Sequence, residues 1–346
     1  MSANRKAYRY PKPRREHAAL PKGASRIAED IRTMRVRGAG LIASSAVTAL
    51  KIAAQKSPAE DPGSFMRDLS DAARVLLETR PTAVSLPNGI RYVMHRVNRA
   101  KANATSGADL KLVASKAADE FVELTRTAVE RIGEIGAKRI RDGVVVLTHC
   151  NSTAAISVMT TAWRQGKKFE VYATETRPRF QGRLTARVLA RLGIPVTLIL
   201  DDAVRYFMQD VDMVLVGADA ITANGALVNK VGTSMVALAA HEVHVNVNVA
   251  AESYKFSPET MIGELVEIEE RDPSEIISAK ALSQIGRRVK VRNPSFDLTP
   301  PEFVDAIITE RGIIPPLGAM LILQEVFGVL TPEELTEYQT YKLSEA

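Results

Sequence analysis

The stretch that decides the fold runs from Gly143 to Ile156 and reads GVVVLTHCNSTAAI. Its first part, Val144 to Leu147, is apolar and mostly β-branched, which is typical of a strand buried on both faces. Polar residues follow, and the pattern from Ala154 to Trp163 is helical. The only cysteine of the chain, Cys150, therefore lies where we expect a central strand to end and a helix to begin.

This position allows two interpretations of Cys150. Ligands of open α/β sheets bind at the carboxyl ends of strands, and a helix N-terminus lowers the pKa of a thiol. A free cysteine is also commonly a small buried hydrophobe with no chemical role. The position alone does not decide between a reactive thiol and a packed one.

Strand and helix patterns alternate from Gly143 onwards. Strands are expected at 144–148, 169–174, 195–200, 212–216, 245–250 and 303–308. Helices are expected at 152–165, 180–192, 202–208, 233–242 and 315–327. This alternation predicts an α/β fold with a Rossmann-like, doubly wound parallel sheet. The glycine fingerprints of dinucleotide sites and P-loops, GxGxxG and GxxxxGK[ST], are absent from the sequence.

The chain before this region predicts helices alone. Helical periodicity begins near Ser25, and RVRGAG at 35–40 predicts a bend or a fresh helix start because each glycine costs a helix roughly 1 kcal/mol. Further helices are expected at 65–78, 89–103 and 108–136. We therefore divide the chain into a tail at 1–22, an all-helical domain at 23–138 and a Rossmann-like catalytic domain at 139–346.

Composition narrows the class of protein. The chain has 346 residues with 46% hydrophobic and 25% charged side chains, which is typical of a globular protein. One cysteine excludes a disulfide framework and a multi-cysteine zinc site, and it favours the cytoplasm. The sequence shows no membrane span, no secretory signal and no convincing metal-ligand cluster, and His241 and His244 are interpreted as structural. We expect neither a metal nor another cofactor.

The net charge of +6 belongs to the N-terminal tail. Residues 1–22 hold seven basic residues against Glu16, or 7 − 1 = +6, and the remaining chain is neutral at 39 − 39. Three prolines and little apolar content predict a disordered or loosely docked segment. Because the folded body has no basic stripe, nucleic-acid binding is not expected as the main function.

A second expected strand end carries Asp219. It follows the apolar residues Val214 to Val216 within MVLVGADAITANGALVNKVGT, residues 213–233. Burial there would raise the pKa of the carboxyl group and let it hold a proton near neutrality, although a cap or turn aspartate is the simpler alternative. Asn229 and Lys230 come directly before a helix start, a place that suits a hydroxyl or phosphate group, and their alternative is a solvated turn.

Other stretches suit anions. Arg37, Gly38, Ala39 and Gly40 combine a guanidinium group with amides that can approach an oxyanion closely. Arg80, at an expected helix start, and Lys255, after the strand at 245–250, are further candidates. Three arginines after the strand at 169–174 are weaker candidates, because most arginines lie on the surface; they are Arg177, Arg179 and Arg183.

Taken together, these motifs resemble one family. It joins sugar-phosphate aldose–ketose isomerases to the regulatory subunits of translation initiation factor 2B, and the resemblance covers roughly 25–330. The motifs are RGAG at 37–40, RPTAVSLPN at 80–88, THCNS at 148–152, ETRPRFQGR at 175–183, GADAITANGALVNKVGT at 217–233 and DLTPPEFVDAIITERGIIPP at 297–316. CNSTAAI looks like the archaeal ribose-1,5-bisphosphate isomerases, whereas methylthioribose-1-phosphate isomerases usually have a glycine after CN-x.

The resemblance implies a fold and a reaction. A helical domain would pack on a Rossmann-like domain, and the site between them would convert ribose 1,5-bisphosphate to ribulose 1,5-bisphosphate in nucleoside monophosphate salvage. Cys150 would be the base and Asp219 the acid. The substrate would be held by Arg37, Gly38, Ala39, Gly40, Arg80, Asn229, Lys230 and Lys255. The family also implies a homo-oligomer, a dimer or a hexamer, and leaves a nucleotide activator open.

Elementary chemistry is consistent with this pair. The C1 phosphate prevents the ring from opening as a free sugar does, so an acid must protonate the ring oxygen while a base removes the C2 proton. Two alternatives stay open: a methylthioribose-1-phosphate type of isomerase, and a non-catalytic regulatory subunit. Regulatory subunits generally lack the Cys and Asp pair, and both residues are present here.

Overall fold

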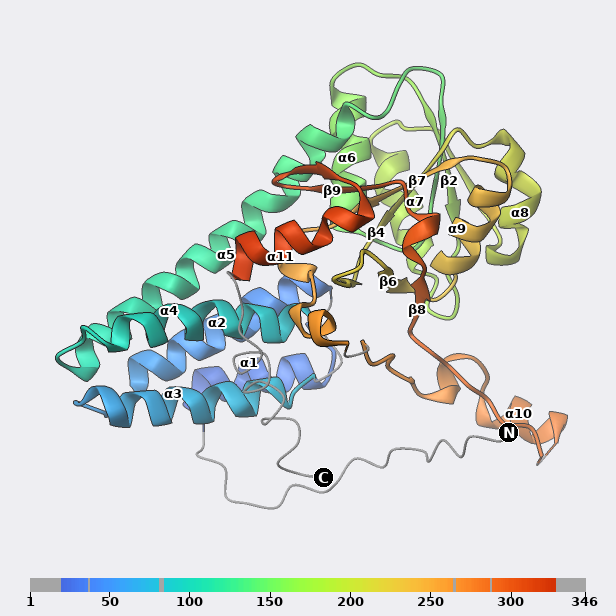
Figure 1. Ribbon diagram of the computed structural model, residues 1–346. Coiled ribbons are helices and arrows are strands. Elements are labelled where there is room, and N and C mark those ends of the chain that lie inside the picture. Colours follow the sequence, from blue (N-terminus) through green and yellow to red (C-terminus); the bar gives the residue numbers. More distant parts are fainter. Residues whose placement is uncertain (1–19, 37, 81–83, 264–265, 287, 328–346) are drawn as a thin grey trace.

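Five helices form the first part of the chain in the computed structural model, which describes residues 20–36, 38–80, 84–263, 266–286 and 288–327. They are α1 (Lys22–Arg32), α2 (Ala39–Lys56), α3 (Pro62–Leu77), α4 (Ser85–Lys101) and α5 (Gly107–Ala137) (Figure 1). Their starts follow local chemistry: Asp61 accepts a hydrogen bond from the Ser64 amide before α3, and Ser106 and Asp109 form a capping box at α5. The break at RVRGAG separates α1 from α2, as predicted.

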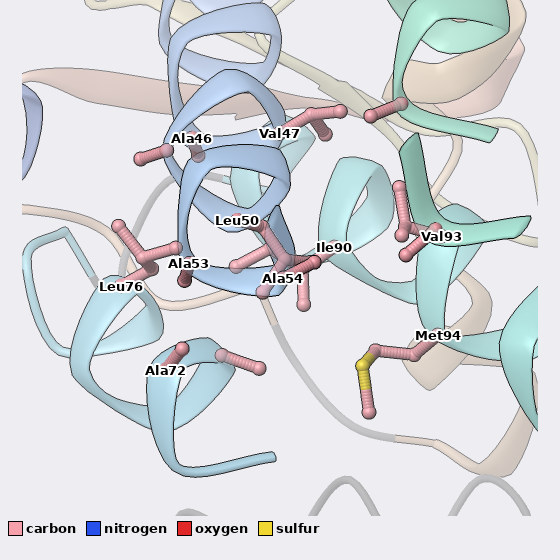
Figure 2. Packing of buried hydrophobic residues seen from close by; sticks show 14 of the residues in the cluster. Ala46, Val47, Leu50, Ala53, Ala54, Ala72, Leu76, Ile90, Val93 and Met94 are labelled. Atoms are coloured by element: carbon pink, nitrogen blue, oxygen red, sulfur yellow. The ribbon is translucent and has the colours of Figure 1, made fainter. Parts of the chain in front are cut away.

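Small side chains pack this helical part. Figure 2 shows alanines of α2 facing leucine, isoleucine, valine and methionine side chains of α3 and α4. Alanine at these positions lets the helices approach closely while it keeps a high helix propensity. The core is therefore built around α2, which contacts each of the other four helices.

A seven-stranded sheet dominates the second part. Its order is β10-β9-β7-β4-β1-β2-β3, and the strands are parallel except for β10, which is antiparallel to β9. The strands are β1 (Val145–Thr148), β2 (Glu170–Thr174), β3 (Val196–Ile199), β4 (Met213–Gly217), β7 (Asn246–Ala250), β9 (Ala306–Thr309) and β10 (Gly312–Ile314). The chain runs from β1 outward to β3 and then crosses to β4 on the other side of β1. The order of strands therefore reverses between β1 and β4.

Helices cover both faces of this sheet, as the alternating pattern predicted. They are α6 (Thr153–Arg164), α7 (Gln181–Arg191), α8 (Val204–Phe207), α9 (Thr233–Glu242) and α11 (Ala319–Phe327). One apolar cluster joins the strands to α5, α6 and α7, and another joins them to α8, α9 and α11. The predicted α/β class and Rossmann-like sheet are confirmed. None of the described helices is both long enough and apolar enough to cross a membrane.

A second sheet and an excursion were not predicted from the sequence. β5 (Ala220–Ile221), β6 (Leu227–Lys230) and β8 (Phe296–Thr299) form a three-stranded antiparallel sheet. Between β7 and β8 the chain leaves the body as a long segment that carries α10 (Ala279–Ile285) (Figure 1). Short 3₁₀ turns complete the described chain: η1 (Asp201–Ala203), η2 (Met208–Asp210), η3 (Ser253–Lys255), η4 (Pro258–Ile262), η5 (Pro273–Glu275), η6 (Pro301–Phe303) and η7 (Pro316–Gly318).

The two parts share side chains across their boundary. The first half of α5 packs in the helical core through Leu110 and Phe121, whereas Ile132 and Ala137 of the same helix pack against the sheet. Tyr254 of η3 belongs to the helical core although it follows β7. The sequence pattern therefore changes from helices alone to strand–helix alternation near residue 138. The boundary between the two cores lies earlier, within α5. Residues 1–19 of the predicted tail lie outside the described residues.

Candidate functional site

The candidate site lies where the strand order reverses. Cys150 follows the carboxyl end of β1, and Asp219 follows that of the neighbouring strand β4. Such a reversal is the place where open α/β sheets bind ligands. The two strand ends also pack closely, since a Cβ atom added to Gly217 would lie 2.3 Å from Oγ of Ser152. Only glycine fits at this point of β4.

The backbone of Cys150 is held in an uncommon conformation. Its φ angle is 70°, which costs a residue with a side chain roughly 1–3 kcal/mol. The amide of Cys150 donates to Oγ1 of Thr176 at 2.9 Å, and its carbonyl accepts from Oγ1 of Thr185 at 2.8 Å. The amide of Thr176 in turn donates to the carboxylate of Asp201 at 2.7 Å. Two neighbouring segments therefore fix the direction of the thiol.

His149 is a fixed, buried part of this framework. Its Nε2 atom lies 2.9 Å from the carbonyl oxygen of Val231, so Nε2 carries the hydrogen and Nδ1 accepts from Oγ1 of Thr174 at 2.7 Å. Burial lowers the pKa of His149, which keeps the imidazole neutral. The side chain links β1 to β2 and to the end of β6.

A helix N-terminus was expected to lower the pKa of the Cys150 thiol, and the structure contradicts this expectation. Ser152, two residues later, is the N-cap of α6, and its hydroxyl accepts from the Ala155 amide at 3.2 Å. Sγ of Cys150 instead faces Oε1 of Gln181 at 3.7 Å. Burial raises the pKa of Cys150 to about 12, and the ammonium group of Lys230 lowers it only in part. The surroundings therefore keep the thiol neutral.

Asp219 has the environment that the sequence predicted. Burial raises the pKa of its carboxyl group, and the cations of Lys255, Lys230 and Arg80 oppose that effect. Its amide donates to the carbonyl of Val228 at 2.9 Å, which ties the end of β4 to β6. Three of the candidate cations thus act on one carboxyl group, although they come from distant parts of the sequence.

Two amides at the start of α9 are bound by a carboxylate of the protein itself. Asp297 of β8 accepts from the amides of Gly232 at 2.7 Å and Ser234 at 3.2 Å. Asn229 is a buried residue of β6, not a solvated turn, and its amide group donates to Oγ1 of Thr233 at 3.1 Å. Lys230 donates to the carbonyl of Ser295 at 2.8 Å.

The remaining candidate substrate-binding residues come from the helical part of the chain. Gly38 is the N-cap of α2 with a φ angle of 87°, and the carbonyl of Ala39 accepts from Ser85 at 2.8 Å. Arg80 pairs with Glu269 of the excursion at 2.9 Å, while its buried Nε has no hydrogen-bond partner among the described residues. Gly40 approaches Tyr254. Arg37 lies outside the described residues.

The structure also shows residues that the sequence did not single out. Asn88, within RPTAVSLPN, donates to the carbonyls of Tyr254 at 2.9 Å and Phe256 at 2.7 Å and so holds the segment that bears Lys255. Glu252 pairs with Lys255 at 2.6 Å. Asn88 could have been noticed as a polar residue within RPTAVSLPN. Glu252 could have been noticed as a carboxylate just after an expected strand.

The three weaker arginines do not form a common anion site in the described chain. Arg179 pairs with Glu275 at 2.6 Å and Arg183 with Glu175 at 2.7 Å, and Arg177 is exposed. Across the described ranges, no group of three or more His, Cys, Asp and Glu side chains is arranged to hold a metal ion.

Comparisons with known proteins place the chain in a family. A family model described as the Initiation factor 2 subunit family matches residues 35–316. A ribose 1,5-bisphosphate isomerase of Thermococcus kodakarensis is 55% identical over 313 residues, which cover 90% of this chain and 96% of that protein. A methylthioribose-1-phosphate isomerase of Geotalea uraniireducens is 39% identical over 83% of this chain and 86% of that protein. The solved structure of a Pyrococcus horikoshii translation initiation factor eIF-2B has a TM-score of 0.72 at 31% identity, over 86% of this chain and 98% of that one.

The chain therefore belongs to the Initiation factor 2 subunit family. Its similarity to named isomerases extends over nearly its whole length at 45–55% identity. Within the family, we assign the chain to the aldose–ketose isomerases.

Proposed function

We propose that this enzyme converts ribose 1,5-bisphosphate to ribulose 1,5-bisphosphate. The observation that carries the proposal is the pair Cys150 and Asp219 at adjacent strand ends, with Arg80, Lys230 and Lys255 acting on the carboxyl group. The same activity is the name of relatives that are 45–55% identical to the chain. A place in the salvage of nucleoside monophosphates is part of the proposal.

Ring opening is the first step that the pair would perform. Asp219 gives its proton to the ring oxygen as the bond from C1 to that oxygen breaks, and the Cys150 thiolate takes the proton from C2. The electrons of the C2–H bond form a double bond between C1 and C2. The raised pKa of Asp219 suits this step, since an acid must still hold its proton near neutrality.

Ketonisation completes the reaction. The C1-phosphorylated enol loses its hydroxyl proton at C2 and takes a proton at C1, which gives the ketone and leaves the C1 phosphate in place. Arg80, Lys230, Lys255, Asn229 and the start of α2 would hold the two phosphates and the hydroxyl groups. Charge-assisted hydrogen bonds suit phosphate oxygens, and the cations here come from both parts of the molecule.

Turnover of three sugar phosphates tests the substrate. Ribose 1,5-bisphosphate, methylthioribose 1-phosphate and ribose 5-phosphate would be compared at equal enzyme concentration, each with and without AMP as a trial activator. We expect the bisphosphate to give the highest kcat/KM. Preference for methylthioribose 1-phosphate would replace the proposed substrate, and no turnover of any of the three would favour the regulatory-subunit alternative.

We also propose self-association through the surface around α11. Leu317 is 82% exposed and Leu321 is 66% exposed, and Met320 lies between them. Exposed apolar side chains that gather on one short segment are typical of a protein interface. Sedimentation of the wild type and of a Leu317→Glu, Leu321→Glu double variant tests this, and a monomeric wild type would contradict it.

A further inference from the structure

A buried carboxylate lies beside the proposed site without a role in the steps above. Glu252 follows β7 by two residues and is 1% exposed. Its Oε2 atom lies 2.6 Å from Nζ of Lys255, and its Oε1 atom accepts from the hydroxyl of Tyr254 at 3.1 Å. A buried ion pair is weak evidence for a role in stability, because desolvation opposes the attraction. A role in the site itself is the more specific explanation.

The same carboxylate touches the junction with the helical part. A Cβ atom added to Gly40 would lie 2.6 Å from the Tyr254 hydroxyl oxygen and 4.0 Å from Oε1 of Glu252. The Tyr254 ring packs against Phe121 of α5 with ring centroids 5.6 Å apart. Glu252 therefore lies where the start of α2, the helical core and the candidate cation Lys255 meet.

The segment that bears this pair is rigidly held. Asn88 of α4 donates to two of its carbonyls, as described above, and Glu310 accepts from the Ser253 amide at 3.0 Å. Contacts on both sides fix the backbone from Glu252 to Phe256. The carboxylate and the ammonium group consequently have defined positions relative to the end of β4.

The charges of Glu252 and Lys255 both affect the pKa of Asp219. Lys255 of η3, Lys230 of β6 and Arg80 before α4 all lower the pKa of Asp219, while Glu252 raises it. Without Glu252, three cations would act on the carboxyl group with no anion among these groups to oppose them. The proton that the acid must donate would then be lost at a lower pH.

We propose that Glu252 is a positioning residue, which fixes Lys255 beside the substrate and offsets its charge so that Asp219 keeps the proton it donates. The inference rests on the proposed function for the identity of the acid. The electrostatic relation among the three groups can be measured without substrate.

The experiment titrates Asp219 directly in the full chain. Infrared spectra recorded between pH 4 and pH 9 follow the carboxylic acid band, and Asp219→Asn identifies the contribution of this residue. We expect Glu252→Gln to lower the pKa of Asp219, because the variant removes the anion that opposes the three cations. In kcat profiles, the fall in activity on the alkaline side should move to lower pH by the same amount.

Three variants separate this role from a structural one. Glu252→Asp keeps the charge and should retain the wild-type titration. Glu310→Gln alters a carboxylate that follows β9 and accepts from the Ser253 amide of this segment, and it should leave the Asp219 titration unchanged. Lys255→Met removes the opposing cation and should raise the pKa of Asp219. An equal shift in Glu310→Gln would assign the effect to loss of the fold of the segment and overturn the inference.

The outcomes distinguish this inference from the proposed function. An unchanged titration in folded Glu252→Gln overturns the role of Glu252 while leaving the reaction intact. If that variant does not fold, Lys255→Met decides, and an unchanged or lowered pKa of Asp219 overturns the inference. Titration shifts as expected in an enzyme that does not turn over ribose 1,5-bisphosphate would support the charge relation and contradict the proposed reaction.

Discussion

The ends of β1 and β4 carry acidic groups in similar surroundings, but the two groups need opposite protonation states. Burial raises the pKa of Cys150 to about 12, and it also raises the pKa of Asp219. For the proposed acid, this shift supports the function, because the carboxyl group must hold a proton. For the proposed base, the same shift opposes the function, because a thiol must ionise before it can accept one.

The difference teaches that a strand end at a topological reversal does not by itself prepare a base. Lys230 lowers the pKa of Cys150, but a negative charge on Asp201, or on Asp219 once it has lost its proton, raises it further. We therefore expect the thiol to ionise only if substrate binding changes its surroundings. This expectation makes Cys150, and not Asp219, the group whose state should differ between the free and the working enzyme.

The largest expected effect comes from removing either member of the pair Cys150 and Asp219. Cys150→Ser and Asp219→Asn should each lower kcat by roughly a thousandfold or more, since each removes a proton-transfer group, while substrate binding is largely kept. The double variant should be scarcely worse than either single one, because the two groups act as one unit. Steady-state kinetics with calorimetric binding measure both. Substantial turnover in Cys150→Ser, or losses that multiply in the double variant, would contradict acid–base catalysis by this pair.

The next effect concerns the thiol of the free enzyme. A rise in pKa from 9.0 to about 12 leaves roughly a thousandfold less thiolate at pH 7, so alkylation of Cys150 by iodoacetamide should slow by about that factor. Mass spectrometry follows the reaction at one position, because the chain has one cysteine. The urea-unfolded chain is the matched control. Alkylation of the folded enzyme at pH 7 as fast as in that control would show that the thiol is not held neutral.

The sequence predicted the parts of this comparison that depend on pattern. Apolar runs that end in polar residues placed Cys150 and Asp219 at strand ends, and the strand–helix alternation predicted the parallel sheet. The sign of the thiol shift could not be predicted, because it depends on how protein atoms surround Sγ and on Ser152 taking the cap of α6. A local pattern shows which groups are close in sequence, but burial is a property of the whole fold.

The three-stranded sheet of β5, β6 and β8 shows the same limit of prediction from a local sequence pattern. β5 and β6 have two and four residues, too few for a periodicity to be recognised. β8 pairs with β6 across more than 60 residues of chain, which brings Asp297 onto the amides at the start of α9. The position of Asn229 and Lys230 before that helix start suggested a place for a hydroxyl or phosphate group, and no local pattern indicated that a carboxylate from a distant strand binds two of its amides.

A smaller effect separates the cations that act on both strand ends from those that act on one. Lys230 lowers the pKa of Cys150 and of Asp219, whereas Arg80 acts on Asp219. Lys230→Ala should raise KM about ten- to a hundredfold and also lower kcat, because the thiol loses a cation that lowers its pKa. Arg80→Ala should raise KM by a similar factor with kcat within a few-fold of the wild type.

Glu269→Gln is the matched control for Arg80, because it removes the carboxylate that pairs with the guanidinium group at 2.9 Å and leaves the arginine in place. Its KM should be no higher than that of the wild type. Equal falls in kcat for Lys230→Ala and Arg80→Ala would contradict a separate action of Lys230 on the thiol.

The smallest expected effect concerns Asp297, a partly buried carboxyl group. Its amide donors test how far hydrogen bonds can oppose burial. Burial raises its pKa, the amides of Gly232 and Ser234 lower it, and the result is about 6, against 3.8 for the unperturbed group. The folded state therefore binds the proton at a higher pH than the unfolded state does. This carboxylate opposes folding fully above pH 6, and the penalty disappears as the pH falls below 4.

Asp297→Asn has no such titration, so the free energy of unfolding of the wild type relative to the variant should increase by roughly 2 kcal/mol between pH 7 and pH 4. Urea unfolding at several pH values measures the difference, and the comparison with the variant cancels the titration of Asp219 and the other carboxyl groups. A difference that stays constant with pH would mean that the amides fully offset burial at Asp297. Amide groups that donate to a carboxylate at the end of β4 would then be expected to cancel the effect of burial on its pKa as well. The raised pKa of Asp219 would in that case require that no amide donates to its side chain.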